Sequence, residues 1–273
     1  MADIVACVNL KGGVGKTALA VNFAAYCGLQ DLSTLLIDLD PQTNATFSSY
    51  GFEEWSEWTK ENGTIADILG ARKHTHAEDK DVEIGSVIIE GVFKNVDLIP
   101  SHLDLFTIDL DMAGAAARER KLKRALKSVE NEYDIIICDC PPNLTIPTQN
   151  ALAASSHYVI PVSPDFLSSI GIALLMSRIS EFSADMEHQI ELAGIALSRV
   201  GRPSEYRTLT KDELRSTFGE SVFQTEIKER SVVSEASAIA KSVFDMKNAD
   251  AKEEFKGVSD EILDCLGDQD EDA

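Results

Sequence analysis

Short, continuously apolar runs alternate along the chain with longer segments of helical periodicity. A continuous apolar run of this length is typical of a strand that is buried on both faces, as in parallel sheets. Each run, taken with its exit, predicts one strand: residues 4–8, 33–41, 96–101, 133–142, 157–162 and 190–197. Because helical sequence separates these runs, we predict an α/β fold in which a mostly parallel, twisted sheet carries helices on both faces.

Two helices are predicted in the first third of the chain, at residues 18–29 and 64–69. The rest of segment 47–95 has no strong period and predicts surface helix and loop. Trp55 and Trp58 are three residues apart and could share one helical face. We expect them to pack in the core rather than to form a partner site.

A third helix is predicted at residues 115–129, because an apolar stripe recurs there at helical spacing. The stripe would pack on the sheet and turn six basic side chains outward. We expect these charges to form a solvated face, with DNA contact as the alternative. The stripe consists of Leu122, Ala125, Leu126 and Val129, and the basic residues are Arg118, Arg120, Lys121, Lys123, Arg124 and Lys127.

Length and composition favour one nucleotide-binding domain. The chain has 273 residues, of which 44% are hydrophobic, enough for a sizeable core. We expect this domain to span residues 1–266 and an acidic, disordered tail to follow at 267–273. No uncharged apolar run reaches the length of a membrane span, and the chain enters its first strand without a positively charged leader. We therefore expect a cytoplasmic protein with no membrane partner.

The formal net charge of −21 argues against indiscriminate nucleic-acid binding. The charge is unevenly distributed, however. Residues 199–247 carry nine Lys and Arg against eight Asp and Glu, which leaves −22 for the rest of the chain. Any contact with DNA is therefore expected in this segment.

Residues 11–17, Lys-Gly-Gly-Val-Gly-Lys-Thr, join the first predicted strand to the first predicted helix. Backbone N–H groups at a helix N-terminus hold polyphosphates, and glycines let the chain turn there without Cβ clashes. Lys16 would reach the β- and γ-phosphates, and the Thr17 hydroxyl would bind Mg²⁺. Leu10 stands where the usual pattern has a glycine, and a second lysine, Lys11, opens this tighter variant of the loop. The predicted nucleotide contacts are Lys11, Gly12, Gly13, Val14, Gly15, Lys16, Thr17 and Ala18.

Two predicted strands end in carboxylates. Ligands of parallel sheets bind at the carboxyl ends of the strands, so Asp38, Asp40 and Asp139 should face the loop. Asp38 and Asp40 lie at i and i+2 and point to one side of their strand, which favours a metal or water-activating role over simple strand termination. Asp139 has the position expected for a group that orients Mg²⁺-bound water.

These segments together resemble the ParA family of partition ATPases, which belongs to the deviant Walker A group of P-loop ATPases. The sequence Asp-Leu-Asp-Pro-Gln-Thr-Asn-Ala-Thr at 38–46 is specific to the ParA branch. The resemblance extends over residues 4–265. Since no N-terminal helix-turn-helix extension is expected, the chain resembles the shorter, chromosomal-type members rather than those that also repress an operator. It is carried by residues 11–17, 36–46, 97–101 and 133–142, and by Val222-Phe223 with Ser234-Glu235-Ala236.

The resemblance implies a weak, Mg²⁺-dependent ATPase that works as an ATP-dependent dimer switch. In the family the first loop lysine, here Lys11, crosses to the phosphates of the partner's ATP, so that two nucleotides are sandwiched between the subunits. Asp40 would position the attacking water, while Thr17, Asp38 and Asp139 would form the Mg²⁺ shell. Lys16 and the loop amides would stabilise the charge on the transferring phosphoryl group.

The resemblance also implies nonspecific DNA binding by the ATP dimer, a nucleoid-associated location, and a ParB-like partner that stimulates hydrolysis. The cycle would segregate a chromosome or plasmid. At Val232 this chain departs from the family, which has a DNA-contacting arginine there, and this loss should weaken binding to phosphates. The cations that are expected to contact DNA are Arg207, Lys228, Arg230 and Lys241.

Other functions remain as alternatives. The same switch could position a protein cargo, such as a chemoreceptor array or a microcompartment. A membrane-cycling regulator like MinD would need a basic amphipathic helix near the C-terminus, whereas residues 252–266 are acidic. A metabolic enzyme on this fold, driving ligation or reduction with ATP, would need further ligand sites.

Overall fold

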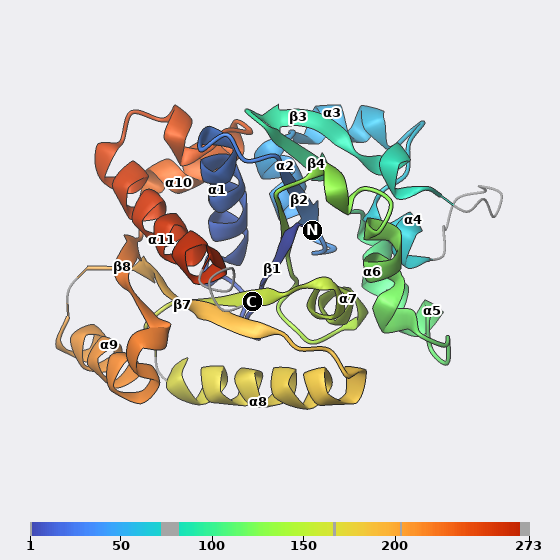
Figure 1. Ribbon diagram of the computed structural model, residues 1–273. Helices are drawn as coiled ribbons and strands as arrows, with labels where there is room; N and C mark the ends of the chain where they lie inside the picture. The colour runs from blue at the N-terminus through green and yellow to red at the C-terminus, as the bar shows by residue number, and fades with distance from the viewer. Residues whose placement is uncertain (1, 72–81, 166–167, 203, 268–273) are drawn as a thin grey trace.

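A computed structural model describes residues 2–71, 82–165, 168–202 and 204–267. Figure 1 shows a central sheet with helices on both of its faces. The eight strands lie in the order β3-β4-β2-β5-β1-β6-β7-β8. Their bounds are β1 Asp3–Cys7, β2 Thr34–Asp38, β3 Ile89–Phe93, β4 Val96–Ile99, β5 Ile135–Asp139, β6 His157–Val162, β7 Glu191–Val200 and β8 Val222–Lys228.

The described helices cover the sheet and connect its strands. The α-helices are α1 Lys16–Leu29, α2 Asn44–Ser49, α3 Phe52–Trp58, α4 Ile65–Leu69, α5 Ile108–Asp111, α6 Lys121–Leu126, α7 Ile146–Ala154, α8 Ser168–Met186, α9 Glu205–Phe218, α10 Ser231–Ala238 and α11 Ala249–Gly267. Short 3₁₀ helices lie at Ile84–Val87, Leu103–Thr107, Arg118–Arg120, Glu130–Glu132, Gly219–Ser221 and Val243–Asp245.

Strand β1 separates two hydrophobic cores because its side chains alternate between the two faces of the sheet. Ile4, Ala6 and Val8 belong to the core beneath α6, α7 and α8. Val5 and Cys7 belong to the core beneath α1 and α11. Both faces are therefore buried, which accounts for the continuous apolar runs in the sequence.

The parallel register fixes the position of the site. Strands β1, β2 and β5 run side by side, and Asp38 at the end of β2 pairs in register with Asp139 at the end of β5. Cys7, at the end of β1, lies opposite Asp139 on the other side. The loops that leave these three strands therefore emerge at one edge of the sheet, where ligands bind in such folds.

The structure confirms the six predicted strands and the mostly parallel sheet, in which β3 pairs antiparallel with β4. It also contains β3 and β8, which the sequence analysis does not predict. The prediction of one helix over 115–129 is wrong in part: the α-helix covers Lys121–Leu126 only. The backbone of Ala117 is left-handed (φ 53°) and interrupts the helix, although Leu122, Leu126 and Val129 are buried as expected.

The tryptophan prediction is also confirmed for Trp55, which is buried, while Trp58 packs against the core from a half-buried position. Helix α4 begins where predicted, with Thr64 and Asp67 forming a capping box. The acidic tail predicted at 267–273 lies outside the described residues from 268 onward. In the part of the chain that the structure describes, no helix is both long and apolar enough to cross a membrane.

Helix α11 protects the edge of the sheet at β8. An edge strand presents unpaired N–H groups, which must find other partners. The Glu261 carboxylate accepts from the N–H groups of Gln224 and Thr225, at 2.6 and 2.8 Å. Glu254 accepts from the Lys228 N–H at 3.1 Å. Two carboxylates of α11 thus accept hydrogen bonds from N–H groups of the edge strand β8.

Glu261→Ala should therefore destabilise the fold, since it leaves two N–H groups of β8 without an acceptor. We expect the free energy of unfolding to fall by about 1–3 kcal/mol. Urea unfolding of the full chain measures this change. Asp264→Ala, an exposed acidic position one turn along α11, is the matched control and should change stability by less than about 0.5 kcal/mol. Equal losses in the two variants would contradict the edge role of Glu261.

Candidate functional site

The segment between β1 and α1 forms a phosphate-loop turn. Gly13 and Gly15 have left-handed backbones (φ 73° and 91°), and α1 begins directly after them at Lys16. A side chain at either position would be strained, so these two glycines are required by conformation. Gly12 does not have a positive φ, and an added Cβ would meet only Pro142, at an ordinary 4.0 Å. The turn places backbone N–H groups at the positive end of the α1 dipole, where an anion is favoured.

Three side chains bind the carbonyls of this loop. The Ser198 hydroxyl donates to the carbonyl of Val14. The Arg199 guanidinium donates to the carbonyl of Gly13 at 2.6 Å, and the Lys16 ammonium donates to that of Lys11 at 3.1 Å. With these carbonyls engaged, the loop can present its N–H groups to a ligand.

Ser198 and Arg199 contact the phosphate loop, and the sequence analysis does not predict these contacts. They lie at the carboxyl end of β7, the position where parallel strands place ligand contacts. This position at the end of a predicted strand is the feature of the sequence that could have indicated them. Arg199 has a left-handed backbone (φ 49°), a strained conformation for a residue with a side chain. Its guanidinium also donates to Glu229 at 2.8 Å, so it links the loop to the segment after β8.

Asp139 lies directly beneath the loop and is fully buried. Its Oδ2 accepts from the Thr17 hydroxyl at 2.7 Å. Its Oδ1 is one of three buried side-chain oxygens without a hydrogen-bond partner among the described residues. Burial, and then the neighbouring Asp38, raise the pKa of Asp139. A carboxylate oxygen and a hydroxyl placed together in this way fit Mg²⁺, a hard cation that binds oxygen ligands.

Lys16 is buried near Asp139 and Asp40, at 6% exposure. Burial lowers the pKa of Lys16, while the charges of Asp139 and Asp40 oppose that shift. The ammonium therefore lies where it can be paired with the phosphates of a nucleotide.

The Asp38 carboxylate is hydrogen-bonded to the segment that follows β2 rather than to the phosphate loop. Its Oδ1 accepts from the Asp40 N–H at 3.1 Å. Its Oδ2 accepts from the N–H and hydroxyl of Thr46, at 2.8 and 2.7 Å. Both oxygens are thus occupied in holding the loop after β2, and a direct Mg²⁺ contact for Asp38 stays a prediction. Burial raises the pKa of Asp38 to about 7.

Asp40 and the phosphate loop line one cleft of about 350 Å³. Asp40 is 6% exposed, and one of its carboxylate oxygens accepts from the Gln42 N–H at 2.9 Å. Away from the loop, the cleft is lined by Ile227, Val233 and Phe255, apolar side chains that suit the base of a nucleotide.

Lys11 is not among the described residues that line this cleft. Its ammonium lies 2.5 Å from a carboxylate oxygen of Asp165, just after β6. Both side chains are about half exposed, at 57% and 45%. The two loop lysines are therefore separated: Lys16 faces the cleft of its own chain, and Lys11 faces solvent beside Asp165.

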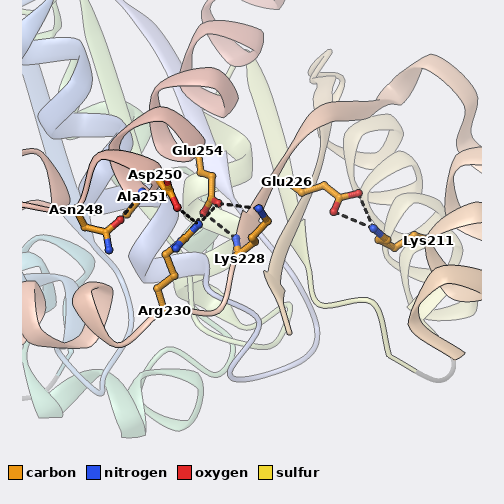
Figure 2. A network of polar contacts seen from close by, with 8 residues as sticks. All are labelled: Lys211, Glu226, Lys228, Arg230, Asn248, Asp250, Ala251 and Glu254. Carbon is orange, nitrogen blue, oxygen red and sulfur yellow. Dashed lines mark hydrogen bonds and ion pairs between the residues drawn. The ribbon is translucent and has the colours of Figure 1, made fainter. Parts of the chain in front are cut away.

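The cations predicted to contact DNA do not form one free basic patch. Figure 2 shows Lys228 and Arg230 turned toward Glu254, with Asp250 also beside Arg230. The shortest of these contacts joins Arg230 to Glu254 at 2.7 Å. Carboxylates of α11 thus offset Lys228 and Arg230, which both line the nucleotide cleft.

The other two predicted DNA contacts lie apart from that network. Arg207 donates to the carbonyl of Arg202 at 2.8 Å. Lys241 is exposed and lines a smaller groove of about 220 Å³ between α1, α2 and α10. Val232, the position of the family's arginine, is buried in α10 at 8% exposure. A side chain at that position points into the protein in this structure.

Sequence comparison finds relatives along nearly the whole chain. A family profile described as an AAA domain matches residues 2–192. The sporulation initiation inhibitor protein Soj of Bacillus subtilis (strain 168) is 32% identical over 244 residues, 89% of this chain and 91% of Soj. The cell division protein PomZ of Myxococcus xanthus (strain DK1622) is 32% identical over 237 residues, 87% of this chain and 70% of PomZ. The chromosome partitioning protein ParA of Caulobacter vibrioides (strain NA1000 / CB15N) is 27% identical over 257 residues, 93% of this chain and 91% of that protein.

Solved structures share the fold. A putative plasmid partition protein from Borrelia burgdorferi B31, bound to AMPPNP, has a TM-score of 0.78 at 25% identity and matches 98% of this chain and 100% of that one. Cobyrinic acid a,c-diamide synthase from Mycobacterium smegmatis, with an ATP analogue and magnesium, has a TM-score of 0.78 at 22% identity and matches 96% and 95%. The likeness to the synthase concerns the fold alone.

The pKa of Asp38 generates a prediction for stability without nucleotide. The unfolded chain ionises this carboxyl near its ordinary value of 3.8, whereas the folded chain holds the proton until about pH 7. Between these values the folded state binds more protons, so the free energy of unfolding should fall as pH rises, by on the order of 1 kcal/mol per unit. Asp38→Asn should flatten this dependence relative to wild type in urea unfolding from pH 4 to 8. The exposed Asp264→Asn is the control, and a wild-type slope in Asp38→Asn would contradict the assignment.

Proposed function

The chain belongs to the ParA family of partition ATPases, and we propose that its ATP-bound form is a homodimer that binds DNA and segregates a chromosome or plasmid. The observation that carries the ATPase part of the proposal is that the phosphate loop and Asp40 line one cleft. Asp139 is buried beside Thr17 of that loop, and one of its oxygens has no hydrogen-bond partner among the described residues. A site built in this way suits a nucleoside triphosphate with its cation.

The proposed reaction is hydrolysis of ATP to ADP and phosphate. Thr17 and Asp139 would hold Mg²⁺, which would neutralise charge on the phosphates. Lys16 and the N–H groups of the loop stabilise the charge on the transferring phosphoryl group. Asp40, which lines the same cleft, orients the attacking water. Slow hydrolysis in the absence of a partner is part of the proposal.

The position of Lys11 supports a dimer. An exposed lysine that does not line its own cleft is available to the nucleotide of a second copy. To reach it, Lys11 has to leave Asp165, and the exchange of a carboxylate for a polyphosphate favours the ATP-bound dimer. ADP, with one phosphate fewer, would offset the loss of Asp165 less well.

DNA binding by this dimer would use Arg207 and Lys241, together with Lys228 and Arg230. Since the last two are paired with carboxylates of α11, DNA phosphates have to compete with these carboxylates. We therefore propose weak, nonspecific binding that falls steeply with salt. Release from DNA would follow hydrolysis stimulated by a ParB-like partner.

A second cargo class fits the same switch. The identity to PomZ, a cell division protein, is as high as the identity to Soj, so the load of this ATPase need not be a chromosome or plasmid. A protein assembly is our alternative. Neither reading requires a membrane, and α11 carries acidic side chains where a basic membrane-binding face would be needed.

The DNA switch can be tested by fluorescence anisotropy with unrelated duplexes over a salt series. ATP should strengthen binding by at least about tenfold over ADP, independently of sequence, because the dimer doubles the number of phosphate contacts. Lys11→Ala should bind ATP but lose this gain, and Lys16→Ala should lose ATP binding itself. Dimerisation by ATP without DNA binding at any salt would overturn the DNA part and favour a protein track.

The Lys11–Asp165 pair gives a separate prediction for dimerisation. Asp165→Asn frees Lys11, so ATP-dependent dimerisation should strengthen by about two- to fivefold, as expected for the loss of an exposed ion pair. Analytical ultracentrifugation with a nonhydrolysable ATP analogue measures this, at low and high salt. Asp31→Asn removes the partner of another exposed pair, with Lys94 at 2.7 Å, and should leave dimerisation unchanged. A weaker dimer in Asp165→Asn would show that Asp165 itself supports the interface.

A further inference from the structure

The turn that carries Asp40 is held by a buried group from outside the cleft. Ser101 follows β4 and is fully buried. Its hydroxyl donates to the carbonyl of Asp40 at 2.7 Å. Its own N–H donates to the Thr46 hydroxyl at 3.0 Å. Ser101 therefore fixes the turn after β2 at two points, the backbone of Asp40 and the start of α2.

The same turn is held from its other side by Asp38. The Asp40 N–H and the N–H and hydroxyl of Thr46 all donate to the Asp38 carboxylate. Asp40 is thus bound at its N–H by Asp38 and at its carbonyl by Ser101. Each of these bonds is buried, where a hydrogen bond is stronger and a missing partner costs more than at the surface.

Ser101 is in turn held by Trp55. The indole Nε1 of Trp55 donates to the Ser101 carbonyl at 3.0 Å. Phe47 and His102 pack around the indole, with ring centroids at 5.3 and 5.7 Å. The indole is 8% exposed, so its position is determined by packing.

We propose that Ser101 and Trp55 are positioning residues for hydrolysis, which act by fixing the backbone of Asp40 so that its carboxylate meets the attacking water. The proposal rests on the proposed role of Asp40. Neither Ser101 nor Trp55 lines the nucleotide cleft, so neither contributes to nucleotide binding directly. A displacement of a positioning group by a fraction of an ångström lowers turnover strongly, whereas the binding of phosphates to the loop is unaffected.

Ser101→Ala should lower the single-turnover rate of ATP hydrolysis by about tenfold or more. The dissociation constant of a fluorescent ATP analogue should stay within about twofold of the wild-type value, because the phosphate loop is intact. The same substitution at Ser259 is the matched control. Ser259 is equally buried, lies in α11 and has no hydrogen-bond partner for its hydroxyl within the part of the chain that the structure describes, so Ser259→Ala should hydrolyse ATP at the wild-type rate.

Trp55→Phe removes the indole N–H while keeping an aromatic ring in the pocket. We expect a smaller loss of turnover, about threefold or more, with unchanged nucleotide affinity. Trp58→Phe is its control: Trp58 lies on the same helix and donates to the Gly63 carbonyl at 3.2 Å, away from Asp40. This pair tests the proposal even if Ser101→Ala fails to fold.

Asp40→Ala distinguishes the positioning role of Ser101 and Trp55 from the role of Asp40 on which it rests. Wild-type hydrolysis in Asp40→Ala would overturn the role of Asp40 and the positioning role together. Loss of hydrolysis in Asp40→Ala, with wild-type rates in Ser101→Ala and Trp55→Phe, would overturn the positioning role alone. A parallel fall of melting temperature, nucleotide affinity and turnover in both variants would show a structural role only and would also overturn it. In the expected case, adding Ser101→Ala to Asp40→Ala causes no further loss.

Discussion

The site depends on two carboxylates that the sheet holds side by side. The register of β2 and β5 places Asp38 opposite Asp139, and both are fully buried. Buried like charges repel, and hydrogen-bond donors or a cation lower the cost of ionising each of them. Asp38 obtains its donors from the turn after β2, whereas among the described residues Asp139 has Thr17 on one oxygen and no donor on the other. The two carboxylates therefore differ in role: Asp38 holds the turn after β2, whereas Asp139 keeps one oxygen available for a ligand.

The parts of the structure that sequence predicts are those with local causes. The phosphate loop is legible because its chemistry lies within seven consecutive residues, and buried strands because their apolar runs are continuous. Strands β3 and β8 have no such run, since each has exposed positions at an edge of the sheet. The helix predicted over 115–129 has the right stripe, but the left-handed turn at Ala117 leaves no mark in the periodicity.

The supporting residues of the site escape sequence reasoning for a different reason. Arg199 meets the loop carbonyl across 186 residues, and Ser101 meets Asp40 across 61. Serine and arginine are common at strand ends, so only the folded sheet reveals which of them contact the turn. For the basic segment 199–247, the residues themselves are visible in the sequence and their partners are not. Those partners are the carboxylates of α11 that pair with Lys228 and Arg230.

The burial of Trp55 gives the chain a built-in optical probe. The sequence contains two tryptophans, and only Trp55 is bonded to the segment that holds Asp40. Its emission reports on the polarity around the indole, so a rearrangement of that turn during the ATP cycle would change the fluorescence without any attached dye. In a Trp58→Phe variant, Trp55 would be the single tryptophan. Its intrinsic fluorescence would then follow each step of the cycle in real time.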